Sequence, residues 1–247
     1  MRSPLPILTL LALGAGLALA LIAVAGQLDG GRSSDGARST TPGKSSAAER
    51  GGPKALSPRR TREPAPRVRP RIRWRESAAV GTPVAGALEG GVLLPRSGGH
   101  FFTWDPIHRR SPSRPRRRWG TDELVRVLLR VARAYRDDHP SAPRVGIGDL
   151  SRPRGGDFGP QFGGIGHASH QNGLDADVYY PRLDGAERAP KDAGEIRPGL
   201  SQDLVDRFVA AGAEVVYVGP NTGLTGPPGV VVPLVNHDNH LHVRLAP

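Results

Sequence analysis

Apolar and polar residues recur with a helical period just after Trp119. Within residues 124–135, apolar side chains return every three or four positions, with arginines between them, and this spacing predicts an amphipathic helix. Thr121 is a favourable N-cap at the start of this segment. Pro140 disfavours a helical residue before it, so the helix is expected to end near His139.

Later segments predict a second helix and several strands. Ser201 can cap a helix whose apolar face spans residues 204–209 and which stops at Gly212. Alternating or continuous apolar runs predict strands at residues 145–150, 174–180, 215–218, 230–235 and 241–245. Helices and strands joined by short connections favour an α+β fold, with a small antiparallel sheet flanked by helices, over a parallel sheet.

The first 26 residues form an apolar segment that predicts export. An almost unbroken run from Leu5 to Gly26 follows Arg2, and Ala23 and Ala25 fit a cleavage pattern of small residues. These features are typical of a signal peptide. The run is also about 20 residues long, enough to cross a bilayer if it stays uncut, so residues 1–26 are a signal peptide or a membrane anchor. In both cases we expect the rest of the chain in the periplasm or cell envelope.

Residues 27–78 are expected to form a disordered basic linker. They are rich in Gly, Ser, Pro and Arg and contain few large apolar residues, so they bury too little surface to offset the entropy of ordering. Residues 1–118 carry 21 Lys and Arg against 7 Asp and Glu, a net charge of +14, whereas residues 119–247 carry 13 against 16, a net of −3. The basic tail is either a solvated spacer or also a contact to a membrane or an anionic envelope polymer. Export makes nucleic acid an unexpected partner.

Residues 79–118 are expected to form a semi-ordered extension, irregular in structure and packed against a main domain at residues 119–247. They contain apolar residues, glycines, an aromatic patch at residues 100–104 and a second basic cluster. The chain has no cysteine. This excludes disulfides, cysteine-ligated metals and thiol nucleophiles, so any metal must be held by His, Asp or Glu.

Five of the eight histidines fall in two short windows, at positions 167–170 and 237–242. Side chains two residues apart on a strand point to the same face. His240 and His242 are therefore expected to share one face of the last strand, where both imidazoles can reach one metal ion or one pocket.

Two aspartates repeat this spacing after the first histidine window. Asp175 and Asp177 share a face of the strand predicted at residues 174–180. Gly173 lets the chain turn before that strand, so that His170 and Asp177 can converge. Two imidazoles and one carboxylate suit Zn²⁺ and leave a fourth position for water, as in catalytic rather than structural zinc sites. The sequence therefore predicts a zinc site on the sheet.

These motifs resemble those of one peptidase family. Residues 166–178 (GHASHQNGLDADV) and 240–245 (HLHVRL) are similar to the penicillin-insensitive murein endopeptidases, a family in the wider group of lysostaphin-type peptidases, D-Ala-D-Ala metallopeptidases and Hedgehog signalling domains. The resemblance runs from about Trp119 to the C-terminus and includes residues 148–153 (GDLSRP). It implies an α+β fold, Zn²⁺ held by His170, Asp177 and His242, and hydrolysis of D-alanyl cross-links in peptidoglycan. The lack of cysteine departs from the family pattern and bears on stability, not on the site.

The remaining polar residues of the motifs have less defined roles. His240 is the candidate catalytic residue, to orient water, act as general base or stabilise the oxyanion. His167, His237 and Asp175 are candidates to support the ligands by hydrogen bonding or to hold a second metal. Arg152 is a candidate to pair with a stem-peptide carboxylate, although a surface arginine after a strand is the default interpretation.

The leading hypothesis is an exported zinc metalloendopeptidase, a hydrolase whose partner and substrate is peptidoglycan. One alternative is a zinc D,D- or L,D-carboxypeptidase on the same scaffold. The other is a non-catalytic cell-wall-binding module, for which a missing ligand or catalytic histidine would be typical.

Overall fold

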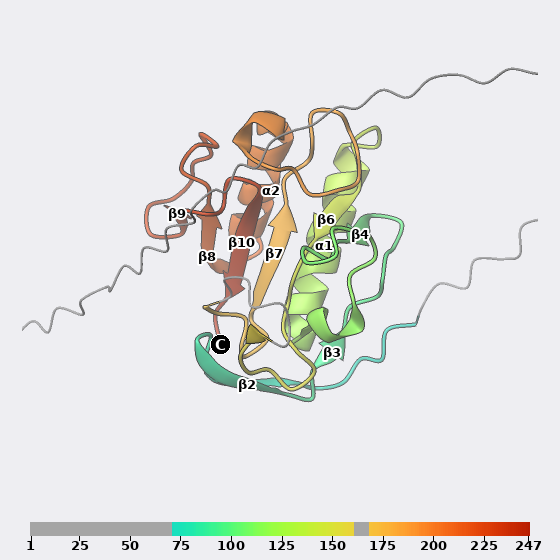
Figure 1. Cartoon of the computed structure of the whole chain (residues 1–247), viewed down its shortest axis with the longest axis vertical. Helices are drawn as coiled ribbons and strands as arrows, with labels where there is room; N and C mark the ends of the chain where they lie inside the picture. The colour runs from blue at the N-terminus through green and yellow to red at the C-terminus, as the bar shows by residue number, and fades with distance from the viewer. Residues whose placement is uncertain (1–70, 161–167) are drawn as a thin grey trace, which may run out of the picture. The chain divides into compact units, whose positions relative to one another are not determined.

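A six-stranded sheet, in the order β4-β6-β7-β10-β8-β9, forms the centre of the fold (Figure 1). The computed structural model describes residues 71–160 and 168–247, all within the compact unit Glu63–Pro247. Its elements are, in chain order, β1 (Ala78–Thr82), β2 (Ala85–Glu89), β3 (Val92–Leu93), β4 (Phe101–Thr103), the 3₁₀ turn η1 (Pro115–Arg117), β5 (Trp119–Gly120), α1 (Asp122–Asp138), β6 (Val145–Ile147), β7 (Asp175–Tyr179), the 3₁₀ turn η3 (Ala193–Glu195), α2 (Pro198–Ala210), β8 (Ala213–Val218), β9 (Val231–Pro233) and β10 (His240–Leu245).

The sheet is antiparallel in its middle and parallel at its edges. Strands β6, β7, β10 and β8 pair antiparallel, as expected. The outer pairs β4–β6 and β8–β9 are parallel, which differs from the predicted all-antiparallel sheet. Parallel neighbours need a crossover connection, and α1 supplies it between β4 and β6.

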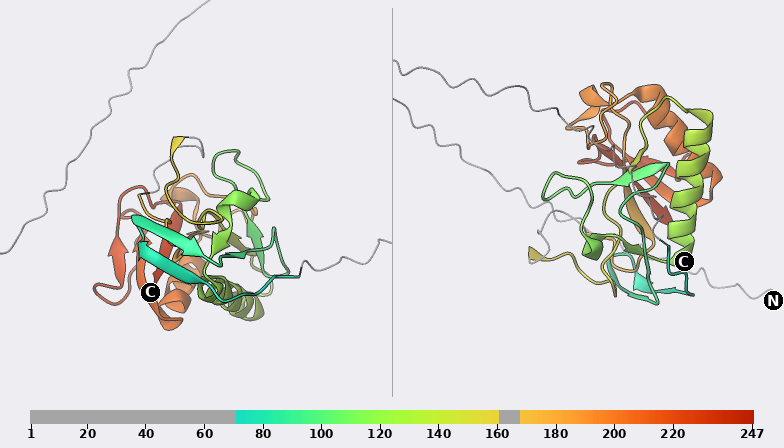
Figure 2. Two further views of the ribbon diagram at one scale, coloured as in Figure 1. Left: turned by 90° about the horizontal axis from the view of Figure 1, so that it is seen from below. Right: turned by 90° about the vertical axis from the view of Figure 1, so that its right-hand side faces the viewer.

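Both helices cover the same face of the sheet, so that the other face is left to loops and polar side chains (Figures 1 and 2). Leu241 and Val243 of β10 are fully buried in the core beneath the helices, together with Val178 of β7. His240 and His242 alternate with them and therefore point to the opposite face.

Helix α1 begins and ends where the sequence predicts. The Thr121 side chain accepts a hydrogen bond from the backbone N–H of Leu124 at 3.1 Å, which satisfies one of the donors left open at a helix N-terminus. The helix ends at Asp138, with His139 as its C-cap. Its apolar face is buried from Leu124 to Tyr135.

Helix α2 starts earlier than predicted. Its N-cap is Arg197 and its first residue is Pro198, a position that proline favours because its fixed φ suits a helix and its missing N–H is not needed there. Ser201 is not the cap but lies one turn inside, where its hydroxyl donates to the carbonyl of Arg197 at 2.9 Å. The predicted end is confirmed, since the helix stops at Ala210 and Gly212 adopts a φ of +86°, the left-handed conformation common after helices.

The segment 79–118 is more regular than expected. Strand β4 joins the central sheet, β1 and β2 form a hairpin, and β3 pairs with β5. The hairpin is held to the loops beneath it by hydrogen bonds such as that from the Leu88 N–H to the Arg154 carbonyl at 3.0 Å. These pairings join residues far apart in sequence, so local composition alone did not reveal them.

The predicted linker at residues 27–78 extends too far toward the domain. Its last part packs on the start of α1, where the Ser77 hydroxyl donates to the Asp122 carboxylate and accepts from the Asp122 backbone N–H, each at 2.7 Å. The guanidinium carbon of Arg126 lies 4.1 Å from the centre of the Trp74 ring. The signal or anchor segment 1–26 and linker residues 27–70 lie outside the described residues, and within residues 71–160 and 168–247 no helix is long and apolar enough to cross a membrane.

The Thr121 cap gives a test of how α1 is held. Replacing Thr121 with Ala removes the acceptor for the Leu124 N–H and is expected to lower the free energy of unfolding by about 1 kcal/mol. Urea denaturation of the purified protein followed by circular dichroism measures this loss. Thr121→Ser keeps the acceptor oxygen and serves as the matched control. An alanine variant as stable as the serine variant would contradict the capping role.

Candidate metal centre

The pairing of β7 with β10 brings the two motif strands side by side on the polar face of the sheet. The antiparallel register sets His240 opposite Tyr179, His242 opposite Asp177 and Arg244 opposite Asp175. Because directly opposite side chains on one face lie close together, this register carries the second histidine window to the aspartate motif.

His170 reaches the same face from the loop before β7. Its φ is +71°, a left-handed conformation that is uncommon for a residue other than glycine and is typical of functional loops. The loop is held in this shape because the His170 N–H donates to the Asp175 carboxylate at 3.2 Å. Gly173, at a φ of +81°, packs so closely on Leu88 that a Cβ would lie 2.8 Å from the leucine side chain.

Three side-chain atoms converge at this point. His170 Nε2 and His242 Nδ1 each lie 3.3 Å from Asp177 Oδ1, and His170, Asp177 and His242 offer ligand atoms that all lie within 4.8 Å of one another. The three residues are 1%, 5% and 5% exposed. They form a group that could hold a metal ion.

The distances fit metal ligation better than direct hydrogen bonding. Two atoms bonded at about 2.0–2.1 Å to one tetrahedral zinc ion lie roughly 3.3–3.4 Å apart, and both separations from Asp177 Oδ1 are 3.3 Å. Charge-assisted N–H···O bonds are shorter, at about 2.7–2.9 Å. The contact between His242 Nε2 and Asp175 Oδ1, at 2.8 Å, has that shorter length.

Asp175 fixes the orientation of the His242 ring. Because Nε2 of His242 is bonded to Asp175, Nδ1 is the nitrogen that faces Asp177. Arg244 Nε donates to the same Asp175 oxygen at 2.7 Å, and the other carboxylate oxygen accepts from the His170 N–H. Asp175 therefore contacts both histidine segments, which is how a carboxylate supports metal-bound histidines in proteins.

The electrostatics of the cluster favour a cation. Burial acts to raise the pKa of Asp175, but the bond from His242 and the charges of His170, His242 and Arg244 outweigh it and lower the pKa to about 2. The pKa of Asp177 is lowered well below its usual value in spite of burial, mainly by the charges of His170 and His240. Burial opposes protonation of His242, but its bond to Asp175 and the adjacent Asp177 carboxylate raise its pKa to about 9. Both carboxylates are thus ionised at neutral pH. A metal cation that binds here would replace the proton on His242.

His240 and His237 lie beside this group. His240 Nε2 is 3.6 Å from Asp177 Oδ1 and its Nδ1 is 2.6 Å from Asn239 Oδ1. Its side chain is 18% exposed, more than the three buried residues. The His237 ring centre lies 4.7 Å from that of His240, and burial lowers the pKa of His237. The three histidines of the second window therefore gather in one place, and His240 is more exposed than His242.

Asp149 and Arg152, from the motif at residues 148–153, do not belong to the group of three. Asp149 is buried against Arg117, whose Nε donates to it at 2.6 Å, and its carbonyl accepts from the Asp177 N–H at 2.9 Å. The Arg152 guanidinium donates to the Asp157 carbonyl at 2.6 Å, a contact within its own loop. The role of Arg152 in substrate binding stays a prediction. His167 lies outside the described residues.

Two aromatic side chains near the centre were not expected from the sequence. Tyr217 of β8 stands opposite His242, with ring centres 5.6 Å apart. Phe158 lies edge-on to His170 at 6.3 Å and beneath the Arg117 guanidinium at 4.9 Å. The alternation within residues 213–218 could have placed Tyr217 on one face of a strand. That this strand pairs with β10 depends on tertiary structure and could not be predicted from the local sequence.

Comparison with known proteins identifies one family. Residues 79–207 match the model of the penicillin-insensitive murein endopeptidases, which confirms the resemblance. The match starts well before Trp119 and thus includes the segment 79–118, and it ends before the second histidine window. The place of His240 and His242 in the site therefore rests on the strand pairing. A search of curated proteins found no match.

The contact between Asp175 and His242 can be tested through metal affinity. Asp175→Asn puts an amide NH₂ where a carboxylate oxygen accepts from Arg244 or from His170, and removes the negative charge. It is expected to weaken zinc binding roughly 10- to 100-fold, as measured by competition with a chromophoric chelator. Asp137→Asn, on the exposed surface of α1, is the control. Equal zinc affinity in wild type and Asp175→Asn would contradict the supporting role.

Proposed function

Since the chain belongs to the penicillin-insensitive murein endopeptidase family, and thus to a family of hydrolases that act on murein, we propose that it is an exported zinc endopeptidase that hydrolyses D-alanyl cross-links between peptidoglycan stem peptides. The observation that carries this proposal is the convergence of His170, Asp177 and His242 on one point, with His240 beside them. Its place of action would be the periplasm or cell envelope.

The metal would be held by His170 Nε2, Asp177 Oδ1 and His242 Nδ1. Two imidazoles and a carboxylate are a ligand set found in catalytic zinc sites, where a fourth position stays open. The chemistry that zinc supplies when bound is Lewis acidity, which polarises a scissile carbonyl and makes water a nucleophile near neutral pH. Asp175 would keep the His242 ring in the tautomer that presents Nδ1 to the metal.

His240 is the residue that we propose as general base. With the Nδ1 proton donated to the Asn239 amide oxygen at 2.6 Å, the Nε2 lone pair points toward the centre, 3.6 Å from Asp177 Oδ1. From there it can take a proton from the attacking water and later return it to the leaving amine. After protonation, the same nitrogen can donate to a developing oxyanion.

Two other functions compete with this one. A D,D- or L,D-carboxypeptidase would use the same centre but require a cation close to it for the terminal carboxylate. A non-catalytic wall-binding module would need neither the three candidate ligands nor His240. The chain has all four residues, which favours an enzyme. The basic linker would add contacts to the membrane or to an anionic envelope polymer, and peptidoglycan would be the partner of the folded domain.

Digestion of cross-linked peptidoglycan tests the activity. The purified full-length protein is expected to release monomeric muropeptides, to stop when a chelator removes the metal and to recover when zinc is added. Chromatography of the digest separates this result from the release of free D-alanine, which a carboxypeptidase would give. Binding to the wall without any cleavage by the zinc-loaded protein would favour the binding module.

Substitution of His240 tests its role separately from metal binding. His240→Ala is expected to lower kcat roughly 10²- to 10⁴-fold, the usual contribution of a general base, while it retains zinc. His242→Ala is expected to lose zinc as well as activity, and His139→Ala, at the end of α1 on the helix side, is expected to retain both. A His240→Ala protein that cleaves as fast as wild type would show that another group takes the proton.

A further inference from the structure

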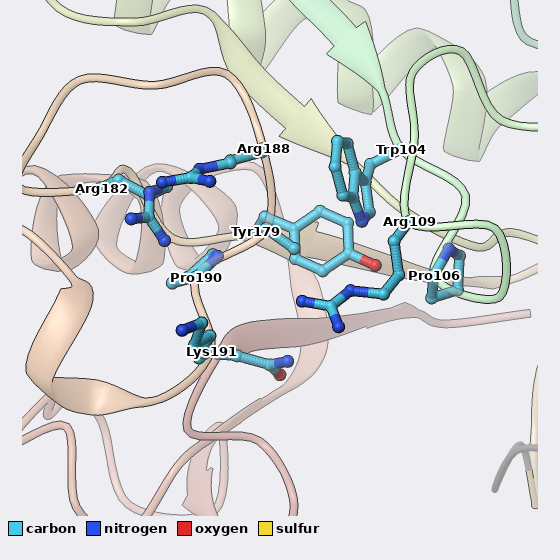
Figure 3. A pocket seen from close by; sticks show the side chains of 10 residues that line it. Trp104, Pro106, Arg109, Tyr179, Arg182, Arg188, Pro190 and Lys191 are labelled. Carbon is cyan, nitrogen blue, oxygen red and sulfur yellow. The ribbon is translucent and has the colours of Figure 1, made fainter. Parts of the chain in front are cut away.

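A cationic hollow of about 430 Å³ lies beside the metal centre (Figure 3). Four basic side chains and two aromatic rings contribute to its lining, namely Arg109, Arg182, Arg188, Lys191, Trp104 and Tyr179. They come from the loop after β4, from β7 and from the loop between β7 and α2. None of the catalytic or metal-binding roles described above uses the four cations.

Two of the residues that line the hollow are direct neighbours of His240. Tyr179 stands opposite His240 in the β7–β10 pairing, and the two ring centres are 6.2 Å apart. Asn239, which also lines the hollow, contacts His240 Nδ1. A substrate whose scissile bond lies at His240 would therefore place a neighbouring group in the hollow.

Two of the four cations are already neutralised. Arg182 pairs with Asp184, at 2.8 Å, and with Glu195, and Arg188 pairs with Asp184 at 3.2 Å. The Lys191 backbone N–H also donates to Glu195. The carboxylates of Asp184 and Glu195 balance two of the four positive charges. The hollow therefore keeps a net positive charge of about two.

The excess resides on Arg109 and Lys191. Within residues 71–160 and 168–247, no carboxylate forms an ion pair with either side chain. Figure 3 shows Arg109 on one side of the hollow, next to the Tyr179 ring, and Lys191 on the other side. Two cations that line one hollow can share one carboxylate, since each forms charge-assisted hydrogen bonds with it.

The loop that carries Arg109 is fixed in shape. Arg109 has a φ of +49°, a strained conformation that persists only where surrounding contacts enforce it. The buried Asp105 supplies these contacts, since its carboxylate accepts from the backbone N–H groups of Ile107 and His108, each at 3.1 Å. Asp105 is itself paired with Arg114. Arg109 is thus presented on a preorganised turn rather than on a loose loop.

We propose that Arg109 and Lys191 form a subsite that binds a free carboxylate of the stem peptide next to the scissile bond. This inference rests on the proposed function for the identity of the ligand. The Trp104 and Tyr179 rings would contact the aliphatic part of the residue that bears the carboxylate. The carboxylate is either one on an internal residue, as in an endopeptidase substrate, or the terminal one that a carboxypeptidase recognises.

Equilibrium binding tests the subsite independently of catalysis. Calorimetry with the metal-stripped full-length protein compares a purified cross-linked muropeptide with the same compound after its carboxylates are amidated. Wild type is expected to bind the carboxylate form roughly tenfold or more tightly, and the Arg109→Gln/Lys191→Gln variant to bind both forms equally. Arg110→Gln, a change in the same turn but outside the hollow, is expected to retain the wild-type preference.

Selective amidation then identifies the carboxylate. If the higher affinity is lost when only the terminal carboxylate is amidated, the subsite binds the C-terminal carboxylate of the stem peptide. If it is lost when only the internal carboxylates are amidated, the subsite binds a carboxylate on an internal residue. Equal affinity of wild type for free and amidated forms, or no binding of either form, would overturn the inference. A carboxylate preference without cleavage by the zinc-loaded protein would overturn the proposed function and leave the subsite standing.

Discussion

The register between β7 and β10 is the constraint on which the centre depends. His242 faces Asp177 across these strands, while Leu241 and Val243 on the other side of β10 are fully buried beneath the helices. A slip by one residue would turn both histidines into the core and both apolar side chains toward the polar face. Burial of the apolar residues therefore fixes the position of the polar ones, so that the hydrophobic core and the candidate metal centre are specified by one strand pairing.

The parts of the fold that local pattern determines were predictable. Period-two alternation indicated β7 and β10, and the Thr121 cap with the apolar stripe behind it indicated α1. The edges of the sheet could not be predicted in this way, because β4 has only three residues and pairs in parallel with a strand more than 40 positions away. The start of α2 was misplaced because both Pro198 and Ser201 suit a helix N-terminus, and the choice between them depends on how the preceding chain packs.

The candidate metal centre was likewise predictable only in the parts that depend on local sequence spacing. The spacing of His240 and His242 and of Asp175 and Asp177 placed each pair on one face, and the strand pairing then joined them. Which carboxylate faces the metal position and which supports His242 could not be read from spacing, because both lie on the same face. The cationic hollow was equally hidden, since Arg109 and Lys191 are 82 positions apart in the chain and line one hollow only in the folded protein.

Anomalous diffraction from crystals of the zinc-loaded protein, recorded on both sides of the zinc absorption edge, would locate the metal and its ligands. We expect one strong peak about 2.0–2.2 Å from His170 Nε2, Asp177 Oδ1 and His242 Nδ1, with Asp175 still bonded to His242 Nε2. A peak coordinated instead by His237 and His240, or the lack of any peak between the three ligand atoms in a protein that binds zinc in solution, would contradict this expectation.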